Sequence, residues 1–153
     1  MIRFEDLTVG EVMTPAPYCV EEETSLTCAV RLLTDLKLSG APVLDHGGAV
    51  VGVISTSDLL GPVQHFLSGR VSSGDLRELT VGDLASRPAV TIRHDEPLVE
   101  GCRRMGLTGF HRLVVVSGEG APVGMLTSWD AAAALGRLER MATEPTGVPE
   151  RSW

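Results

Sequence analysis

The stretch from Gly48 to Asp58 reads GAVVGVISTSD, and a second stretch from Gly120 to Asp130 reads GAPVGMLTSWD. The two stretches lie 72 residues apart, and the same distance separates TVGEV at 8–12 from TVGDL at 80–84. Both pairs recur at one shift without a gap, which indicates a duplicated unit. So long a period is not typical of a solenoid and favours two copies that cover each other's apolar faces. The predicted parts are repeat one (7–69), a polar linker (70–79), repeat two (80–142) and a mobile C-terminal tail (143–153).

Each copy shows the same order of elements: helix, strand, helix, strand, strand and helix. Apolar residues at i, i+3, i+4 and i+7 predict an amphipathic helix from Leu26 to Leu33, and the spacing recurs from Leu98 to Met105. Two short strands follow, apolar on both sides, so we expect them to be buried on both faces. In the last helix of copy one, Pro62 should kink the helix or shift its start. The expected strands are 41–44 and 50–54 in copy one and 113–116 and 122–126 in copy two.

Composition excludes several classes of protein. The chain has 153 residues, 43% apolar and 22% charged, with a net charge of −7. The apolar share suits a packed core, and no apolar run reaches the roughly 18 residues of a membrane span. An acidic chain is poorly suited to a phosphate backbone, so neither nucleic acid nor a membrane is expected as a partner. The N-terminus lacks the apolar segment of a signal peptide, and three cysteines without CxxC spacing are typical of reduced thiols, which predicts a cytoplasmic protein.

The sequence offers little for catalysis. The four histidines form no i, i+4 pair, and neither a P-loop nor a G-x-S-x-G motif is present. We therefore expect neither an enzyme nor a metal site.

Polar residues gather where the last strand of each copy ends. Ser55 and Asp58 in copy one correspond to Thr127 and Asp130 in copy two. The N–H groups of a helix N-terminus suit a phosphate, and a carboxylate can accept both hydroxyls of a ribose diol. The same residue types also form ordinary helix caps, in which an acid stabilises the helix dipole by about 0.3–1 kcal/mol. Recurrence does not separate the two interpretations, because a duplicated cap recurs too.

These motifs resemble a known family. GVISTSDL at 52–59 and GMLTSWD at 124–130 look like the end of a CBS (cystathionine-β-synthase-type) domain, and VGEVMTP at 9–15 and VGDLASRP at 81–88 resemble its opening. The tandem pair resembles a Bateman module over nearly all of 7–142. The resemblance implies an α/β (α+β) fold of two β-α-β-β-α repeats, packed through their sheets with pseudo-two-fold symmetry.

The resemblance also implies a function. Clefts between such repeats bind adenosine compounds, so we expect a non-enzymatic sensor of AMP, ADP, ATP or S-adenosylmethionine that needs no cofactor and acts on a separate regulated protein. The alternative is a degenerate pair without ligand, whose work is dimerisation or docking. Apolar helix faces predict a homodimer with two-fold symmetry, notably Leu59, Leu60 and Val63 in copy one and Ala131, Ala134, Leu135 and Leu138 in copy two.

The resemblance assigns roles to individual residues. Asp58 and Asp130 would hold the ribose, with Ser55 and Thr127 near the ribose or phosphate. The other implied positions line the adenine base or the opposite wall of the cleft. They are Thr14, Val20, Ala41 and Pro42 in copy one and Val90, His111, Arg112 and Leu113 in copy two.

Basic residues distinguish the copies. Copy two places Arg87, His111 and Arg112 where copy one has Pro15, Ser39 and Gly40. A phosphate in a partly dry cleft needs compensating charge, whereas the alternative is a set of solvated surface charges. We therefore expect the cleft built on Thr127 and Asp130, with His111 and Arg112 nearby, to bind a phosphorylated ligand more tightly.

Overall fold

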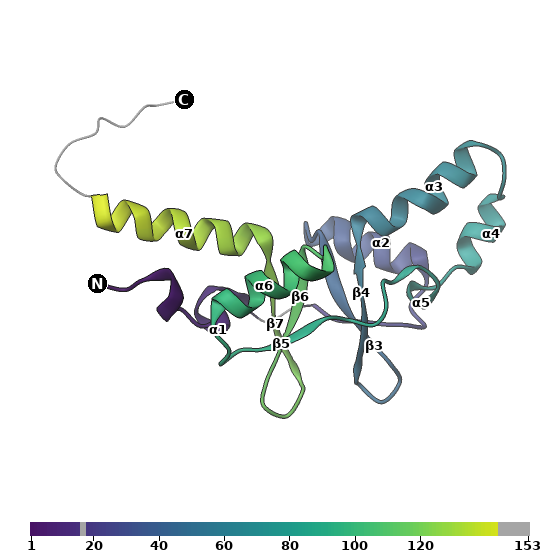
Figure 1. Ribbon diagram of the computed structural model, residues 1–153. Helices are drawn as coiled ribbons and strands as arrows, with labels where there is room; N and C mark the ends of the chain where they lie inside the picture. The colour runs from purple at the N-terminus through teal and green to yellow at the C-terminus, as the bar shows by residue number, and fades with distance from the viewer. Residues whose placement is uncertain (16–17, 144–153) are drawn as a thin grey trace.

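The computed structural model describes residues 1–15 and 18–143 (Figure 1). Repeat one and the linker contain η1 (Phe4–Asp6), α1 (Val9–Val12), β1 (Thr14–Pro15), β2 (Val20–Glu21), α2 (Leu26–Asp35), β3 (Gly40–Leu44), β4 (Val50–Ser55), η2 (Thr56–Leu59), α3 (Leu60–Leu67) and α4 (Ser73–Glu78). Repeat two contains α5 (Val81–Leu84), β5 (Thr91–Arg93), α6 (Leu98–Thr108), β6 (Arg112–Val116), β7 (Pro122–Thr127) and α7 (Ser128–Thr143). The expected order of elements is present in both copies.

The structure differs from the sequence prediction in two segments. The predicted linker contains the helix α4, which Ser72 and Asp75 cap reciprocally: Asp75 N donates to Ser72 Oγ at 3.1 Å, and Ser72 N donates to Asp75 Oδ2 at 2.6 Å. This capping box marks a helix start even in so short and polar a segment. The helix α7 includes Thr143, one residue beyond the predicted boundary, and the rest of the predicted tail lies outside the described residues.

Pro62 shifts the start of the last helix in repeat one. The chain leaves β4 through the 3-10 turn η2, and α3 begins at Leu60, which places Pro62 in its first turn. A proline there removes an N–H that has no intrahelical partner, so the helix tolerates it. The prediction of a shifted start is confirmed.

The described strands form two sheets, with orders β1-β7-β6-β5 and β2-β3-β4. The antiparallel hairpins share one register, with Gly40 opposite Ser55 in one sheet and Arg112 opposite Thr127 in the other. In both sheets the strand before the helix pairs in parallel with the next strand, β2 with β3 and β5 with β6. The edge strand β1 belongs to repeat one by sequence, yet it pairs antiparallel with β7 of repeat two.

The repeats therefore exchange their opening segments. The helix α1 places Val9 in the apolar core of repeat two, and α5 places Val81 in the core of repeat one. After α5, Ser86 pairs with Val53 on β4: Ser86 N lies 2.9 Å from Val53 O, and Val53 N lies 3.1 Å from Ser86 O. Each spatial unit consequently combines parts of both sequence repeats.

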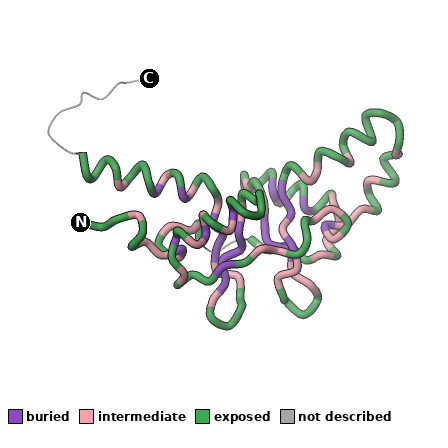
Figure 2. The backbone as a smooth tube through the Cα atoms, viewed as in Figure 1, coloured by how far each residue is buried: buried purple, intermediate pink, exposed green. Residues whose placement is uncertain are grey.

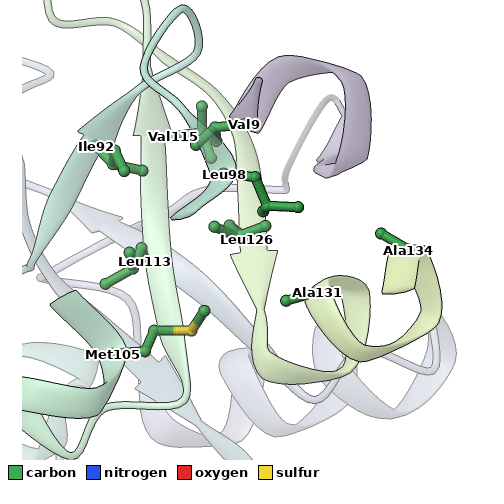
Figure 3. Packing of buried hydrophobic residues seen from close by; sticks show 9 residues of the cluster. All are labelled: Val9, Ile92, Leu98, Met105, Leu113, Val115, Leu126, Ala131 and Ala134. Atoms are coloured by element: carbon green, nitrogen blue, oxygen red, sulfur yellow. The ribbon is translucent and has the colours of Figure 1, made fainter. Parts of the chain in front are cut away.

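Apolar residues fill both faces of the central strands, where Figure 2 shows most of the buried chain. One group joins the strands of repeat two to α1, α6 and α7 (Figure 3): Val9, Ile92, Leu98, Met105, Leu113, Val115, Leu126, Ala131 and Ala134. A second group packs the two sheets together: Val114, Val116 and Met125 against Val50, Val53 and Ala89. Because successive side chains of a strand point to opposite faces, Leu113 and Val114 enter different groups, and both are fully buried. The predicted burial on both faces is confirmed.

Candidate functional site

The carboxylate at the end of each repeat closes a helix cap. Asp58 Oδ2 accepts from Ser55 N at 2.8 Å and from Ser55 Oγ at 3.0 Å. In repeat two, Asp130 Oδ2 accepts from Thr127 N at 3.0 Å, and Asp130 N donates to Thr127 Oγ1 at 3.1 Å. The capping interpretation is therefore confirmed, but the cap uses only one oxygen of each carboxylate. Among the described residues, Asp58 Oδ1 has no hydrogen-bond partner, so it can accept from a ligand.

A cleft of about 160 Å³ lies between the two repeats beside Asp58. Its wall comes from three segments: the end of β4 with η2, the exchanged segment after α5, and the turn that leads into β6. The lining residues are Val53, Ser55, Ser57, Asp58, Ser86, Pro88, Ala89, Val90, Gly109, Phe110, His111 and Arg112. We call this the Asp58 cleft. A ligand in it would contact both repeats.

The structure corrects the expected pairing of charges. His111 and Arg112 line the cleft of Asp58, whereas the sequence prediction placed them with Asp130. The reason is topological: the opening segment of repeat two crosses onto β4, which brings the start of β6 toward the cap of repeat one. The predicted excess of positive charge exists in one cleft, but it accompanies Ser55 and Asp58.

Arg87 does not line the Asp58 cleft. Its guanidinium Nη2 lies 2.7 Å from Glu22 Oε2, in a partly exposed ion pair that joins the two repeats. With its charge compensated by Glu22, Arg87 has a structural partner and is not one of the cleft's cations.

A second set of polar residues surrounds Asp130. Thr14 Oγ1 of the exchanged strand β1 lies 3.5 Å from Asp130 Oδ1, so the structure brings these two predicted site residues together with Thr127. At the position of Ser57 this set has Trp129, whose residue surface is 78% exposed. We call Thr14, Thr127 and Asp130 the Asp130 set. At the 72-residue shift, Ser39 and Gly40 correspond to His111 and Arg112 of the Asp58 cleft.

Four predicted site residues are buried in the packed interior. Val20, Ala41 and Leu113 are 6%, 1% and 0% exposed and belong to the apolar cores, and Pro42 is also fully buried. Their side chains therefore present almost no surface to a ligand. The strands run through these residues into the core, and only the strand ends, such as Arg112, reach the cleft.

Several lining residues were not predicted from the sequence. Gly109 and Phe110 immediately precede His111 in the same turn, and Ser86 and Pro88 precede the predicted Val90. Ser86 and Pro88 lie in the opening motif VGDLASRP, which could have pointed to them, whereas Gly109 and Phe110 are marked only by their adjacency to His111.

The described residues offer little else for chemistry. Burial raises the pKa of the Cys19 thiol, which lowers its reactive thiolate fraction. Within residues 1–15 and 18–143, no group of three or more His, Cys, Asp or Glu side chains is arranged to hold a metal ion. In the same residues, none of the helices combines the length and apolar character needed to cross a membrane.

Two repeats that exchange segments and enclose a polar cleft define a paired-repeat module with a site of small-molecule size. The CBS domain model matches residues 9–64 and again 81–137, which together make up most of the chain. The chain belongs to the CBS-domain family, as a tandem pair.

Similar proteins share this architecture. The chloroplastic CBS domain-containing protein CBSX2 of Arabidopsis thaliana is 30% identical over 163 residues, which cover 91% of this chain and 68% of CBSX2. The crystal structure of CBSX2 in complex with AMP has a TM-score of 0.71 at 32% identity and covers 87% of this chain and 98% of that chain.

Two further likenesses extend the comparison. The CBS domain of a bacterial CNNM/CorC family Mg²⁺ transporter, in complex with ATP, has a TM-score of 0.73 at 23% identity and covers 87% of this chain and 89% of that one, a likeness of fold alone. The protein MJ1404 of Methanocaldococcus jannaschii is 29% identical over 113 residues, which cover 74% of this chain but only 25% of MJ1404. The same pair of repeats thus also occurs within a longer protein.

Proposed function

We propose that this chain is a non-enzymatic sensor that binds an adenosine-containing ligand, such as AMP, ADP, ATP or S-adenosylmethionine, in the Asp58 cleft. One observation carries the proposal: a carboxylate with an unused oxygen, Asp58, shares a cleft with the imidazole of His111 and the guanidinium of Arg112. A carboxylate accepts from both hydroxyls of a ribose, and an arginine pairs with a phosphate. The AMP complex of CBSX2 supports the same ligand class.

The apolar part of the cleft suits a purine. Ala89, Val90 and Phe110 line it, and Phe110 is 42% exposed, so its ring is available to a ligand. Aromatic and apolar surfaces bind flat heterocycles by dispersion and by removing apolar area from water. The cleft would then place the base, the ribose and the phosphate against three different segments.

Ligand binding would act on the contact between the repeats. The cleft includes Ser55 and Asp58 from repeat one and the exchanged segment 86–90 from repeat two, so a bound ligand ties the two together. We expect the bound state to differ in stability or association and to be recognised by a separate regulated protein. Three cysteines without CxxC spacing support a cytoplasmic location, and the exposed helix faces support a homodimer.

The test is calorimetric titration of the chain with AMP, ADP, ATP and S-adenosylmethionine, followed by the variant Asp58→Asn. The asparagine carbonyl can still accept from Ser55, but its NH₂ group cannot accept from the ribose. Hydrogen bonds to charged groups contribute about 1.5–3 kcal/mol, so the affinity should fall by roughly tenfold or more.

Asp83→Asn is the matched control. Asp83 Oδ2 accepts from Thr80 N at 2.8 Å and from Thr80 Oγ1 at 3.0 Å, the same cap distances as at Asp58, but Asp83 does not line the cleft. This variant should leave binding unchanged. If none of the four compounds binds the parent chain at millimolar concentration, the proposal is wrong, and a pair without ligand that serves dimerisation or docking takes its place.

A further inference from the structure

Arg112 lies at the place where the two halves of the molecule meet. Its counterpart at the 72-residue shift is Gly40, and the two residues are neighbours in space. A methyl group built on Gly40 would lie 3.2 Å from Nε and 3.3 Å from Cδ of Arg112. Two residues that correspond to each other by pseudo-two-fold symmetry can be neighbours only if they lie close to the symmetry axis, so Arg112 and Gly40 mark this axis. The side chain of Arg112 therefore lines the Asp58 cleft and lies beside Gly40, while Arg112 itself pairs with Thr127, the cap residue of the Asp130 set.

Of these two corresponding residues, only Arg112 places a side chain at the axis. Gly40 has none, so the arginine occupies the space in which a second side chain would otherwise stand. Arg112 also makes no ion pair with any described residue, in contrast to Arg87 and its partner Glu22. Arg112 is half-buried, and its charge is available to an anion in the Asp58 cleft.

Asp58 and Asp130 are the two carboxylates that we expect to bind ribose, and the cap residue of each is related to Arg112 or to its counterpart Gly40 by strand pairing. Ser55, the cap residue beside Asp58, pairs with Gly40 on β3, and Thr127, the cap residue beside Asp130, pairs with Arg112 on β6. Phosphates of ligands held by the two carboxylates would thus point toward a shared centre. Two phosphates there would repel each other, and the single positive charge of one guanidinium cannot neutralise both.

We propose that Arg112 is one phosphate-binding side chain shared by both halves, so that the chain holds one phosphorylated nucleoside at a time. Two unphosphorylated nucleosides, or one of each kind, can bind together. This inference rests on the proposed function, and it gives the second site that the resemblance implies, the Asp130 set, a rule for its occupancy. The exclusion is electrostatic, and it concerns phosphate but neither ribose nor base.

The test compares stoichiometries by calorimetry on the full chain. AMP should saturate at one per chain and adenosine at two per chain, and a chain saturated with AMP should still take up one adenosine. Arg112→Gln should weaken AMP binding by roughly tenfold or more and leave adenosine binding within about twofold. Arg77→Gln, which removes the same charge from the exposed surface of α4, should change neither.

Each other outcome overturns a stated part of the argument. Two AMP molecules bound per chain with similar affinity, or unchanged AMP affinity in Arg112→Gln, would show that the cation is not shared. One adenosine per chain would show that the Asp130 set is not a site, while the proposed function of the Asp58 cleft would stand. If neither AMP nor adenosine binds, the proposed function itself fails, and this inference fails with it.

Discussion

Single glycines permit the exchange of segments between the repeats. A Cβ atom built on Gly52 would lie 2.7 Å from Ser86 O, and one built on its counterpart Gly124 would lie 2.8 Å from Thr14 O. At Gly124 the flexible Met13 side chain is also in the way, but Ser86 O and Thr14 O belong to the crossing backbone, which cannot move aside as a side chain can. The glycine of the repeated motif is thus explained by the close approach of the exchanged segment, and the backbone can cross there only because the side chain is absent.

We predict that Gly52→Ala destabilises the protein by about 1–3 kcal/mol, the usual range for an overpacked site. Urea denaturation measures the effect. Gly106→Ala is the control, because a Cβ there meets nothing within 4 Å and the helix α6 should gain up to about 1 kcal/mol. Equal stability of Gly52→Ala and the parent chain would show that the segments do not cross as described.

Local chemistry at single residues was predictable, and long-range partners were not. The caps at Ser55 and Thr127 follow from residue type and from a carboxylate three positions later. The partners of Asp58 do not, because His111 lies far away in the sequence and both copies carry a carboxylate with the same local surroundings. Only the crossing of the segment around Ser86 decides which carboxylate meets the basic side chains.

At the scale of the element, α6 is supported by a network of ion pairs. Arg103 donates to both oxygens of Glu100, at 2.8 Å from Nε and 2.7 Å from Nη2, and Arg104 Nε donates to Glu100 Oε1 at 2.9 Å. The Arg103 guanidinium, with Arg104 beside it, lowers the pKa of Glu100 from 4.5 to about 2. Arg104 also donates to Thr91 O at 3.0 Å, which ties the helix to β5.

This network predicts a pH dependence with a definite sign. The folded pKa of Glu100 lies below its unfolded value, so its stabilisation is present above about pH 4.5 and is lost as the pH falls toward 2. Glu100→Gln should therefore lower the urea midpoint at pH 7, and the gap to the parent chain should narrow below pH 4.5. Glu119→Gln, in the exposed hairpin turn, is the control. A gap that stays constant between pH 7 and pH 3 would contradict the assignment.

Helices and hairpins were predicted at nearly their observed positions because their signals are local: apolar spacing for α2 and α6, turn glycines for the hairpins. The exchange of α1 and α5 carries no such signal. Val9 and Val81 occupy the same place in equivalent motifs, so each could in principle pack on its own repeat or on the other. Packing of the whole core selects the exchanged arrangement, and no single repeat contains that information.

At the scale of the whole molecule, the helices α3 and α7 leave the central strands toward opposite ends (Figure 1), and Figure 2 shows much of their surface exposed. The helix α3 contains no buried residue, although it is strongly apolar. The large apolar residues that are exposed on these two helices are Leu60, Val63, Phe66 and Leu67 on α3 and Trp129, Leu135 and Met141 on α7. Exposed apolar helix surface of this kind favours an interface between proteins. Ala131 and Ala134, which the sequence placed on the same face of α7, are instead buried in the core of repeat two.

We predict a two-fold homodimer that covers these faces, and sedimentation at tens of micromolar should detect it. Leu67 is 78% exposed, so Leu67→Glu should leave the folded chain intact while placing a charge in the interface, and the variant should sediment as a monomer. Leu107→Glu is the matched control, because Leu107 is 72% exposed on α6, outside the proposed interface, and its variant should remain dimeric. A parent chain that sediments as a monomer would refute the prediction. If instead both variants dimerise, the chains associate through another face, because a charge at Leu67 could not be buried in the proposed interface without a large desolvation cost.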